Sequence, residues 1–452
     1  MLNTVHKITA VLSLALLPLL AAAQQSPLAT YLAMVESEHP DVLRARLVEQ
    51  ERQLSVDLTR ANRRPTVDAI GEYFVAEGGR TIDIPIGDLF NPVYGTLNQV
   101  VGQEAFPTDL ENVSEQFLPS QFYDVRVAAN LPIVQPLIGR ETALREAQLK
   151  TASLATRSVQ RELRREVRML YYAHLQATEG QRIIAEARRL LQEVDRLNDV
   201  LIKNDKITRD ARYRTRAELA ALDGEDALLA QQATVSAAAL NRLLGRPLET
   251  LILTDTTAAQ QLPERTYEQL RTEALAQRPE LQQLESGISS LRLLDDLQAA
   301  ERLPTIGIGG QVGLQGFVDS DFGDHPYGII ALKATWSLYD GGKRRLRRQQ
   351  TQLQQQQLAQ QLETARRDIS LELYQIVQQL ESRQMQLRAA DARITAADEA
   401  YRIIEQRYRA DRALLVELLQ ANTDRTQARQ QRNVLRYQLL QDLAELESVL
   451  GK

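Results

Sequence analysis

The sequence predicts a mixed α/β membrane protein in which long coiled-coil helices alternate with short pairs of β-strands. Three observations carry this prediction. Large apolar side chains recur at every seventh position from Leu373 to Tyr408, within a stretch from Lys343 to Arg409 that contains no proline. Short segments that alternate apolar and polar residues occur at matched places in the two halves of the chain. The halves themselves resemble each other, which indicates an internal duplication.

The composition excludes several classes of function. The chain has 452 residues and a formal net charge of −5, so it lacks the basic field that a nucleic-acid partner would need. It contains no cysteine, which rules out disulfides and thiolate sites. The four histidines are scattered, and no phosphate-binding loop or nucleophile–base set occurs. We therefore expect no enzyme activity, no cofactor and no metal.

Residues 1–23 have the pattern of a secretory signal peptide. Lys7 precedes an apolar stretch from Ile8 to Leu20, and Ala21-Ala22-Ala23 provides a small-residue cleavage site. No cysteine follows that could carry a lipid, so we expect an unlipidated mature chain that begins at Gln24. Later apolar runs all fall short of the roughly 20 residues of a spanning helix, so membrane entry requires β-strands.

The duplication is visible in the spacing of prolines and glycines. Pro40 and Pro279 lie 239 residues apart, as do Pro65 and Pro304. Later in each half the spacing falls to 206, between Gly245 and Gly451. The first half therefore carries an insertion of about 34 residues, between the two strands of its pair.

The first repeat is predicted to span 24–245. Its elements are helices at 40–64, 140–203 and 206–244 and strands at about 66–76 and 122–133. Pro65 ends the first helix, and the apolar period then changes to two. A Thr-rich link at 246–266 leads to the second repeat, 267–452. Its elements are helices at 279–303, 343–409 and 412–450 and strands at about 304–317 and 327–339.

The strands place charged and amide side chains on one face and aliphatic side chains on the other. This pattern is typical of a barrel wall between water and lipid, although half-buried strands of a soluble protein alternate in the same way. We expect five charged residues to face a water-filled lumen: Asp68, Glu72, Asp124, Arg126 and Lys333. Trp336 and Tyr339 suit a membrane interface.

The turns and the inserted segment carry further predictions. Asn204-Asp205 and Ala410-Asp411 separate each long helix from a returning helix, and both residue types tolerate left-handed backbone geometry. The inserted segment, 76–122, contains apolar groups such as Ile84-Pro85-Ile86. We expect this segment to fold over the mouth of the barrel or to dock an exterior partner; a disordered loop is the alternative.

The chain resembles the TolC family of outer-membrane export and efflux channels. The resemblance rests on the duplicated helix–proline–strand units, on the strand exit Trp336-Ser-Leu-Tyr-Asp-Gly-Gly342, and on the segment from Tyr408 to Ala421. It covers essentially the whole mature chain. It implies a homotrimer whose protomers each give four strands to a twelve-stranded barrel in the outer membrane of a Gram-negative bacterium. It also implies a long coiled-coil periplasmic barrel that meets a periplasmic adaptor and an inner-membrane transporter.

The resemblance further implies a gate at the periplasmic tip. Glu417 takes the acidic constriction position, Asp210 is an acidic partner in the first half, and Tyr408 is the aromatic of the gate, with Arg412 nearby. Gln420 departs from the family pattern, because a second acidic residue is expected there. The resemblance leaves open whether the duct serves efflux or protein secretion. A secreted coiled-coil rod or tether without a channel is the alternative function.

Overall fold

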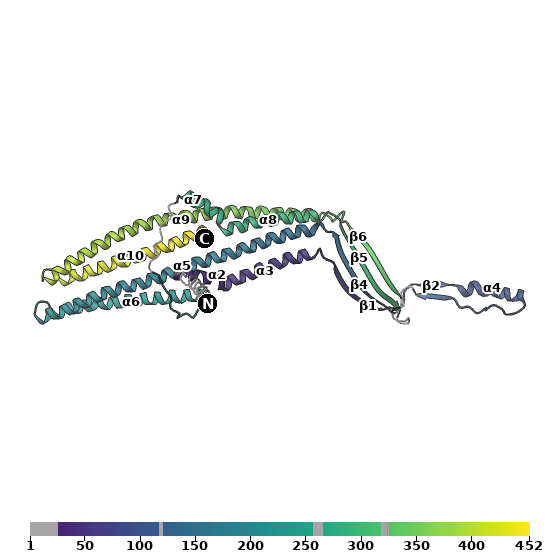
Figure 1. The fold of residues 1–452 in the computed structure, drawn as a ribbon, viewed down its shortest axis with the longest axis horizontal. Helices are drawn as coiled ribbons and strands as arrows, with labels where there is room; N and C mark the ends of the chain where they lie inside the picture. Colours follow the sequence, from purple (N-terminus) through teal and green to yellow (C-terminus); the bar gives the residue numbers. More distant parts are fainter. Residues whose placement is uncertain (1–25, 117–120, 256–264, 318–322, 324) are drawn as a thin grey trace, which may run out of the picture. The chain divides into compact units, whose positions relative to one another are not determined.

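The computed structural model describes residues 26–116, 121–255, 265–317, 323 and 325–452. The predicted signal peptide, 1–23, lies outside the described residues. Figure 1 labels the helices and strands along the chain. The chain divides into two compact units, whose boundaries fall inside four of the helices. A helical unit contains residues up to 54, 146–292 and 352–452, and a sheet unit contains 55–145 and 293–351.

The described elements repeat in the same order, as the duplication predicts. The first repeat contains α2 (Pro27–Glu38), α3 (Pro40–Ala61), β1 (Thr66–Val75), β4 (Gln121–Val134), α5 (Pro136–Lys203) and α6 (Asp210–Leu243). The second contains α7 (Tyr267–Gln277), α8 (Pro279–Ala300), β5 (Thr305–Phe317), β6 (Pro326–Thr335), α9 (Lys343–Arg409) and α10 (Leu415–Val449). The helices α5 and α9 have 68 and 67 residues. The predicted fold class is confirmed at the level of one protomer.

Some element ends differ from the sequence prediction. The last strand was expected to reach residue 339, but β6 ends at Thr335. Trp336 lies beyond it and donates its indole N–H to the carbonyl oxygen of Arg302 at 2.9 Å. Helix α5 begins four residues before position 140, at Pro136, because proline fits the first helical turn. The returning helices start later than expected, at Asp210 and Leu415, because the turns before them are longer.

The inserted segment is folded rather than irregular. It contains β2 (Thr81–Ile84), α4 (Ile86–Val101) and β3 (Val113–Gln116). The strands β2 and β3 pair in antiparallel fashion and form a separate two-stranded sheet. Residues 76–116 therefore contradict the alternative of a disordered loop, while 117–120 lie outside the described residues.

The helical unit buries an aromatic cluster where several of its helices meet. Tyr171 and Tyr172 are at most 1% exposed, and the ring centroids of Tyr31 and Tyr171 are 6.2 Å apart. Their hydroxyls hold the start of the link between the repeats. The Tyr31 hydroxyl accepts from the backbone N–H of Leu253 at 2.9 Å, and the Tyr171 hydroxyl accepts from that of Asp255 at 2.8 Å.

The heptad seam predicted on α9 is buried in this unit. Leu373, Leu380, Tyr401 and Tyr408 are each exposed by 5% or less. Arg383, three residues after Leu380, bonds to Asp442 of α10 at 3.1 Å. Among the described helices none combines the length and the apolar composition needed to cross a membrane.

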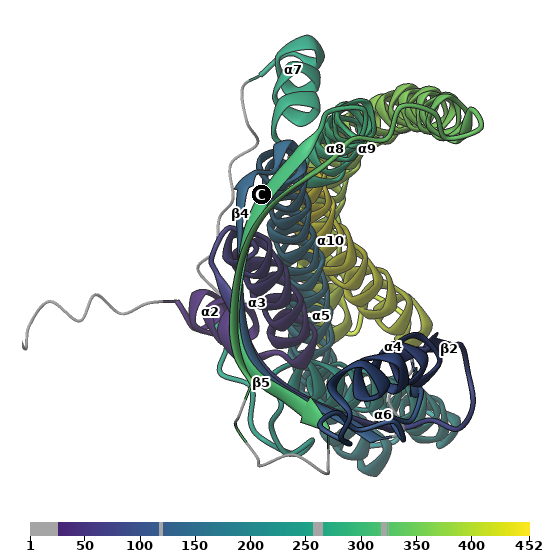
Figure 2. The same ribbon diagram turned by 90° about the vertical axis from the view of Figure 1, so that its right-hand side faces the viewer.

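The sheet unit holds a four-stranded antiparallel sheet in the order β1-β4-β5-β6. Figure 2 shows that its strands curve along their length. β1 and β6 are the two edge strands, and the outer side of each pairs with no other described strand. The sheet register decides which residues share a face, because side chains of directly paired residues point to the same side.

Candidate functional site: the ends of the two helical hairpins

The turns that join α5 to α6 and α9 to α10 have the same backbone geometry. Asp205 has φ 53° and Asp411 has φ 59°, and they are the only non-glycine residues with positive φ in the described part of the chain. In each turn one backbone N–H reaches back five residues: Lys206 to Leu201 at 2.9 Å, and Arg412 to Arg407 at 2.8 Å. This bonding closes the long helix and reverses the chain. The predicted left-handed turns are thus present at both ends.

A small apolar cluster joins the two hairpins near these turns. Val194 comes from α5, Tyr401 and Tyr408 from α9, and Leu418 and Ala421 from α10. Leu418 is only 1% exposed. The Arg425 guanidinium lies 4.9 Å from the centroid of the Tyr401 ring, which places a cation over the aromatic face. The hairpin ends therefore pack on each other rather than projecting separately.

A chain of buried hydrogen bonds runs through this region and connects three helices. The Tyr408 hydroxyl donates to Oδ1 of Asn198 at 2.6 Å, and Nδ2 of Asn198 donates to Oγ1 of Thr215 at 2.9 Å. The Thr215 hydroxyl donates in turn to the carbonyl oxygen of Ala211 at 3.0 Å. Asn198 and Thr215 are completely buried. Burial, with a contribution from Asp411, raises the pKa of Tyr408, so its hydroxyl keeps the proton that it donates.

The predicted gate residues occupy different environments. Tyr408 lies in the interior, and its hydroxyl bonds within its own chain. Glu417 is exposed in the first turn of α10, where its carboxylate accepts from the backbone N–H of Leu414 at 3.4 Å. Arg412 is exposed in the turn, and its carbonyl oxygen accepts from the Arg407 guanidinium at 3.3 Å.

Asp210 lies at the start of α6 and is also exposed. The Thr208 hydroxyl and the Arg214 guanidinium lower the pKa of its carboxyl group. Among the described residues, no hydrogen bond or ion pair joins any two of Glu417, Asp210, Tyr408 and Arg412. One protomer does not assemble these four side chains, so their joint role as a gate stays a prediction.

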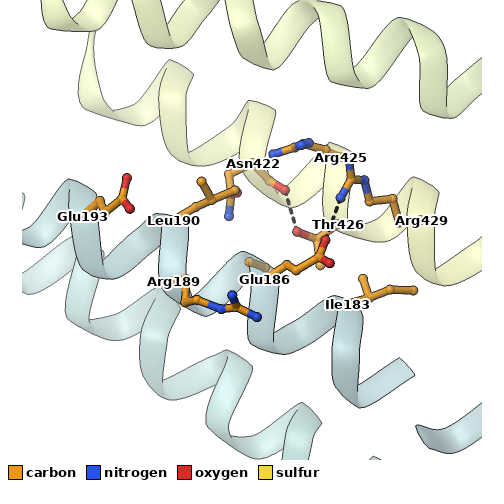
Figure 3. A pocket seen from close by; sticks show the side chains of 10 residues that line it. Ile183, Glu186, Arg189, Leu190, Glu193, Asn422, Arg425, Thr426 and Arg429 are labelled. Atoms are coloured by element: carbon orange, nitrogen blue, oxygen red, sulfur yellow. Dashed lines mark hydrogen bonds and ion pairs between the residues drawn. The ribbon is translucent and has the colours of Figure 1, made fainter. Parts of the chain in front are cut away.

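A polar cavity of about 320 Å³ lies between α5 and α10, next to the apolar cluster. Figure 3 shows its charged side chains, with Glu186 and Glu193 on α5 and Arg425 and Arg429 on α10. Arg429 donates to Glu186 at 3.0 Å. A side-chain oxygen, Oδ1 of Asn422, is buried there without a hydrogen-bond partner in the described structure. The cavity therefore offers charged groups of both signs to a polar partner.

An ion-pair cluster beside the cavity ties α10 to α9. Arg425 and Arg429 both bind Asp398, at 2.5 and 3.1 Å. Burial alone would raise the pKa of Asp398, but the hydrogen bonds from Arg425 and Arg429 outweigh it and lower that pKa. Asp398 is therefore held ionised at neutral pH.

The five predicted lumen residues share one face of the four-stranded sheet. Glu72 of β1 pairs directly with Asp124 of β4. Asp68, Arg126 and Lys333 lie at alternate positions of their strands, and the register places them on the same side as this pair. Arg126 bonds to Glu72 at 2.8 Å and also to Asp124. The opposite face is aliphatic and exposed, with Val312 at 65%, Ile330 at 83% and Leu332 at 70%. Tyr339 is 86% exposed and Trp336 63%, and both lie past the end of β6.

Several solved structures share this fold. The chain is similar to the outer-membrane channel OprN, with a TM-score of 0.73, 17% identity, and coverage of 94% of this chain and 90% of OprN. It is similar to the CmeC outer membrane channel of Campylobacter jejuni, with a TM-score of 0.73, 12% identity, and coverage of 94% and 85%. For the open state of the MtrE outer membrane channel of Neisseria gonorrhoeae, the TM-score is 0.71 at 16% identity, with coverage of 94% and 88%.

The sequence also matches a protein-family model. Residues 270–452 match the family model described as outer membrane efflux protein. The second repeat is therefore similar to this family over almost its whole length. This match confirms the resemblance to the TolC family, and the solved channels show that the whole described chain has their fold. The expected outer-membrane location agrees with the description of the efflux-protein domain. No curated protein sequence matches the chain.

The sequence prediction missed the partners of Tyr408. Asn198 stands in an apolar heptad row of α5, with Leu191, Val194 and Leu201 at spacings of three and four. A polar residue at a core position of a coiled coil requires a specific partner. The position of Asn198 in this row could therefore have predicted that its side chain has a buried hydrogen-bond partner. Nothing in the sequence indicates that Thr215 supplies one of the two hydrogen bonds.

Proposed function

We propose that three copies of this chain form a passive duct that carries substrates from the periplasm across the outer membrane. One observation carries the proposal: the four-stranded sheet has an aliphatic exposed face, a charged opposite face and two unpaired edges, β1 and β6. Four strands cannot close a barrel, and open edges are not stable in a bilayer. Pairing β6 of one copy with β1 of the next gives twelve strands, with the charged face toward the lumen.

The helical unit supports association as well. Leu43, Leu47 and Leu54 form a stripe on α3, and they are 45%, 64% and 63% exposed in the single chain. Side chains at these spacings lie on one side of a helix. A row of exposed leucines on a helix of a secreted protein favours burial against another chain. A second copy of this chain can provide the surface that covers them.

The proposal includes a periplasmic adaptor and an inner-membrane transporter as partners. The polar cavity between α5 and α10 supports it, because charged groups of both signs line it. Polar side chains of an adaptor can bind these groups. Cross-linking of the assembled protein in cells, followed by mass spectrometry, identifies the partner class and so separates efflux from protein secretion.

The experiment that tests the duct is a count of chains together with a conductance measurement. Light scattering corrected for detergent should give three chains, and planar-bilayer recordings should show discrete channels. A stable monomer contradicts the barrel. The rival function, a secreted coiled-coil rod, predicts a protein that leaves the membrane fraction without detergent and never conducts.

The gate is proposed on the exposed carboxylates at the hairpin ends. In a trimer the three Glu417 side chains repeat around one axis, and Asp210 adds charge on the first hairpin. Like charges in a confined tunnel attract cations. Glu417→Gln keeps an acceptor for the Leu414 N–H but removes the charge, so block of single-channel current by divalent cations should weaken several-fold. Glu399→Gln, at an exposed carboxylate paired with Arg402, is the control. Equal block in both variants removes Glu417 from the gate.

A further inference from the structure

The inserted segment folds back on α4 through two matched asparagines. Asn91 exchanges two hydrogen bonds with the backbone of Leu110, both at 2.9 Å. Asn98, seven residues later, does the same with Phe106, at 2.8 and 2.9 Å. Tyr94 lies between them in sequence and stacks on Phe106 at 5.5 Å. Figure 1 shows the return segment running beside α4. One side of α4 is thus covered by its own chain.

Another side of α4 is apolar and exposed to solvent in the single chain. Phe90, Val93, Leu97 and Val100 are 46%, 52%, 38% and 79% exposed. Their spacings of three, four and three are those of the two core positions of a coiled-coil heptad. Asn91 and Asn98 then occupy an outer position of the same heptad, which explains why the return segment leaves the apolar row open. We call these four residues the α4 stripe.

The composition of the insert argues against an anionic lipid surface as the occupant of the α4 stripe. Residues 76–116 contain one basic residue, Arg80, against seven acidic ones: Glu77, Asp83, Asp88, Glu104, Asp109, Glu111 and Glu115. Helices that lie on such a surface carry Lys and Arg on their polar face. On α4 itself the only charged residue is Asp88. The heptad spacing instead fits another helix.

We propose that the α4 stripes of three copies of this chain pack together as a parallel three-helix bundle. The proposal rests on the trimeric duct. The insert leaves the main sheet at β1, an open edge that meets the neighbouring copy in that assembly, and only residues 76–80 separate β1 from β2. Each insert therefore starts beside an interface between copies.

A three-helix bundle this short is stable only if its helices are held close together by their connections to the barrel. Helix α4 has 16 residues, about two heptads, and helices of that length are marginal when isolated. Fixing three of them to one barrel through short connections raises their effective concentration to about the millimolar range. Pro92 lies outside the seam, so it does not disturb packing at the stripe.

Disulfide cross-linking tests the bundle cleanly because the chain contains no cysteine. The full-length protein is purified with Val93→Cys or Leu97→Cys, and with Gln99→Cys as the control. Gln99 is exposed on the same helix but outside the stripe. Light scattering first establishes that each variant is a trimer. Mild oxidation should then link two of the three chains in the stripe variants and leave the control as single chains on a non-reducing gel.

The other outcomes have distinct meanings. Trimers whose stripe variants cross-link no more than the control overturn the bundle and leave the duct intact. If Leu97→Cys then reacts with a maleimide in detergent but is protected in lipid vesicles, the stripe lies on lipid. Protection only after addition of a second protein assigns it to a foreign partner, which also overturns the bundle. Absence of trimers in the unmutated protein overturns the duct and the bundle together.

Discussion

The ends of the two hairpins share a backbone and differ in their side chains. Both turns place an aspartate in the left-handed region and close the long helix with the same pair of backbone bonds. The side chains behind the turns have diverged: Asn198 of α5 corresponds to Ile404 of α9, and Tyr408 of α9 corresponds to Ile202 of α5. Asn198 and Tyr408 bond to each other. Duplication thus preserved what is local, the turn, and changed what must fit between the two copies of the repeat.

The largest effect expected at this interface comes from removing its apolar anchor. Leu418 is 1% exposed in α10, and the corresponding residue of the first repeat is Arg212, which is half-buried and paired with Asp199. Leu418→Ala should lower the free energy of local unfolding by about 2–5 kcal/mol, because it leaves a cavity in the cluster. Arg212→Ala should cost about 1 kcal/mol or less. Hydrogen exchange of the hairpin-end amides measures both changes, and equal losses contradict the difference between the two ends.

The next effect concerns the buried hydrogen bonds between the repeats. Asn198→Ala removes the acceptor of the buried Tyr408 hydroxyl and the donor to the Thr215 hydroxyl, which keeps its bond to the carbonyl oxygen of Ala211. It should destabilise the hairpin ends by about 1–3 kcal/mol. Tyr408→Phe removes one of the two bonds and should cost less.

A double-mutant cycle with these two substitutions separates pairing from packing. If Asn198 and Tyr408 act through one hydrogen bond, the double variant is more stable than the sum of the single losses predicts. Additive losses contradict a direct coupling. If the proposed duct forms, its resting conductance should rise in the same order as the local stability falls.

The sequence predicted those features that short-range rules determine. Pro40, Pro65 and Pro279 fix helix ends, and the seven-residue period from Leu373 to Tyr408 identifies α9 as a long helix. The alternating strands follow from the period of two. The aspartate turns follow from the tolerance of that side chain for left-handed geometry.

Longer-range features were not predictable in the same way. The inserted segment folds because Asn91 and Asn98 meet a return segment that has no regular structure, and no periodic pattern announces such a contact. The gate assignment of Tyr408 came from the resemblance, which transfers position but not environment. The hydroxyl is buried because Asn198, 210 residues away, supplies its acceptor.

Acid should weaken the second hairpin through Asp398. Arg425 and Arg429 lower its pKa, so its contribution is complete above the unfolded value of about 3.9 and is lost as the pH falls through the lower folded value. The corresponding residue of the first repeat, Gln192, does not titrate. Because Asp398 is 36% exposed, the contribution is about 1 kcal/mol.

Asp398→Asn isolates this contribution. At pH 7 the variant should show faster amide exchange around α9 and α10 than the unmutated protein, and the difference should shrink below about pH 4. Gln192→Asn, at the corresponding position, is the control and should give no pH-dependent difference. A difference that persists unchanged at low pH contradicts the ion pair as its cause.

The smallest effect tests what the two ends have in common. Asp205 and Asp411 have positive φ, a region in which a Cβ atom crowds the backbone and glycine does not. At each position the Gly variant should be more stable than the Ala variant, by about 1 kcal/mol in the free energy of local unfolding. Because the two turns make the same backbone bonds, the Gly–Ala difference should be equal at both ends. Hydrogen exchange of the four single variants measures it. Unequal differences mean that the side chains behind each turn, and not the turn itself, set the local stability.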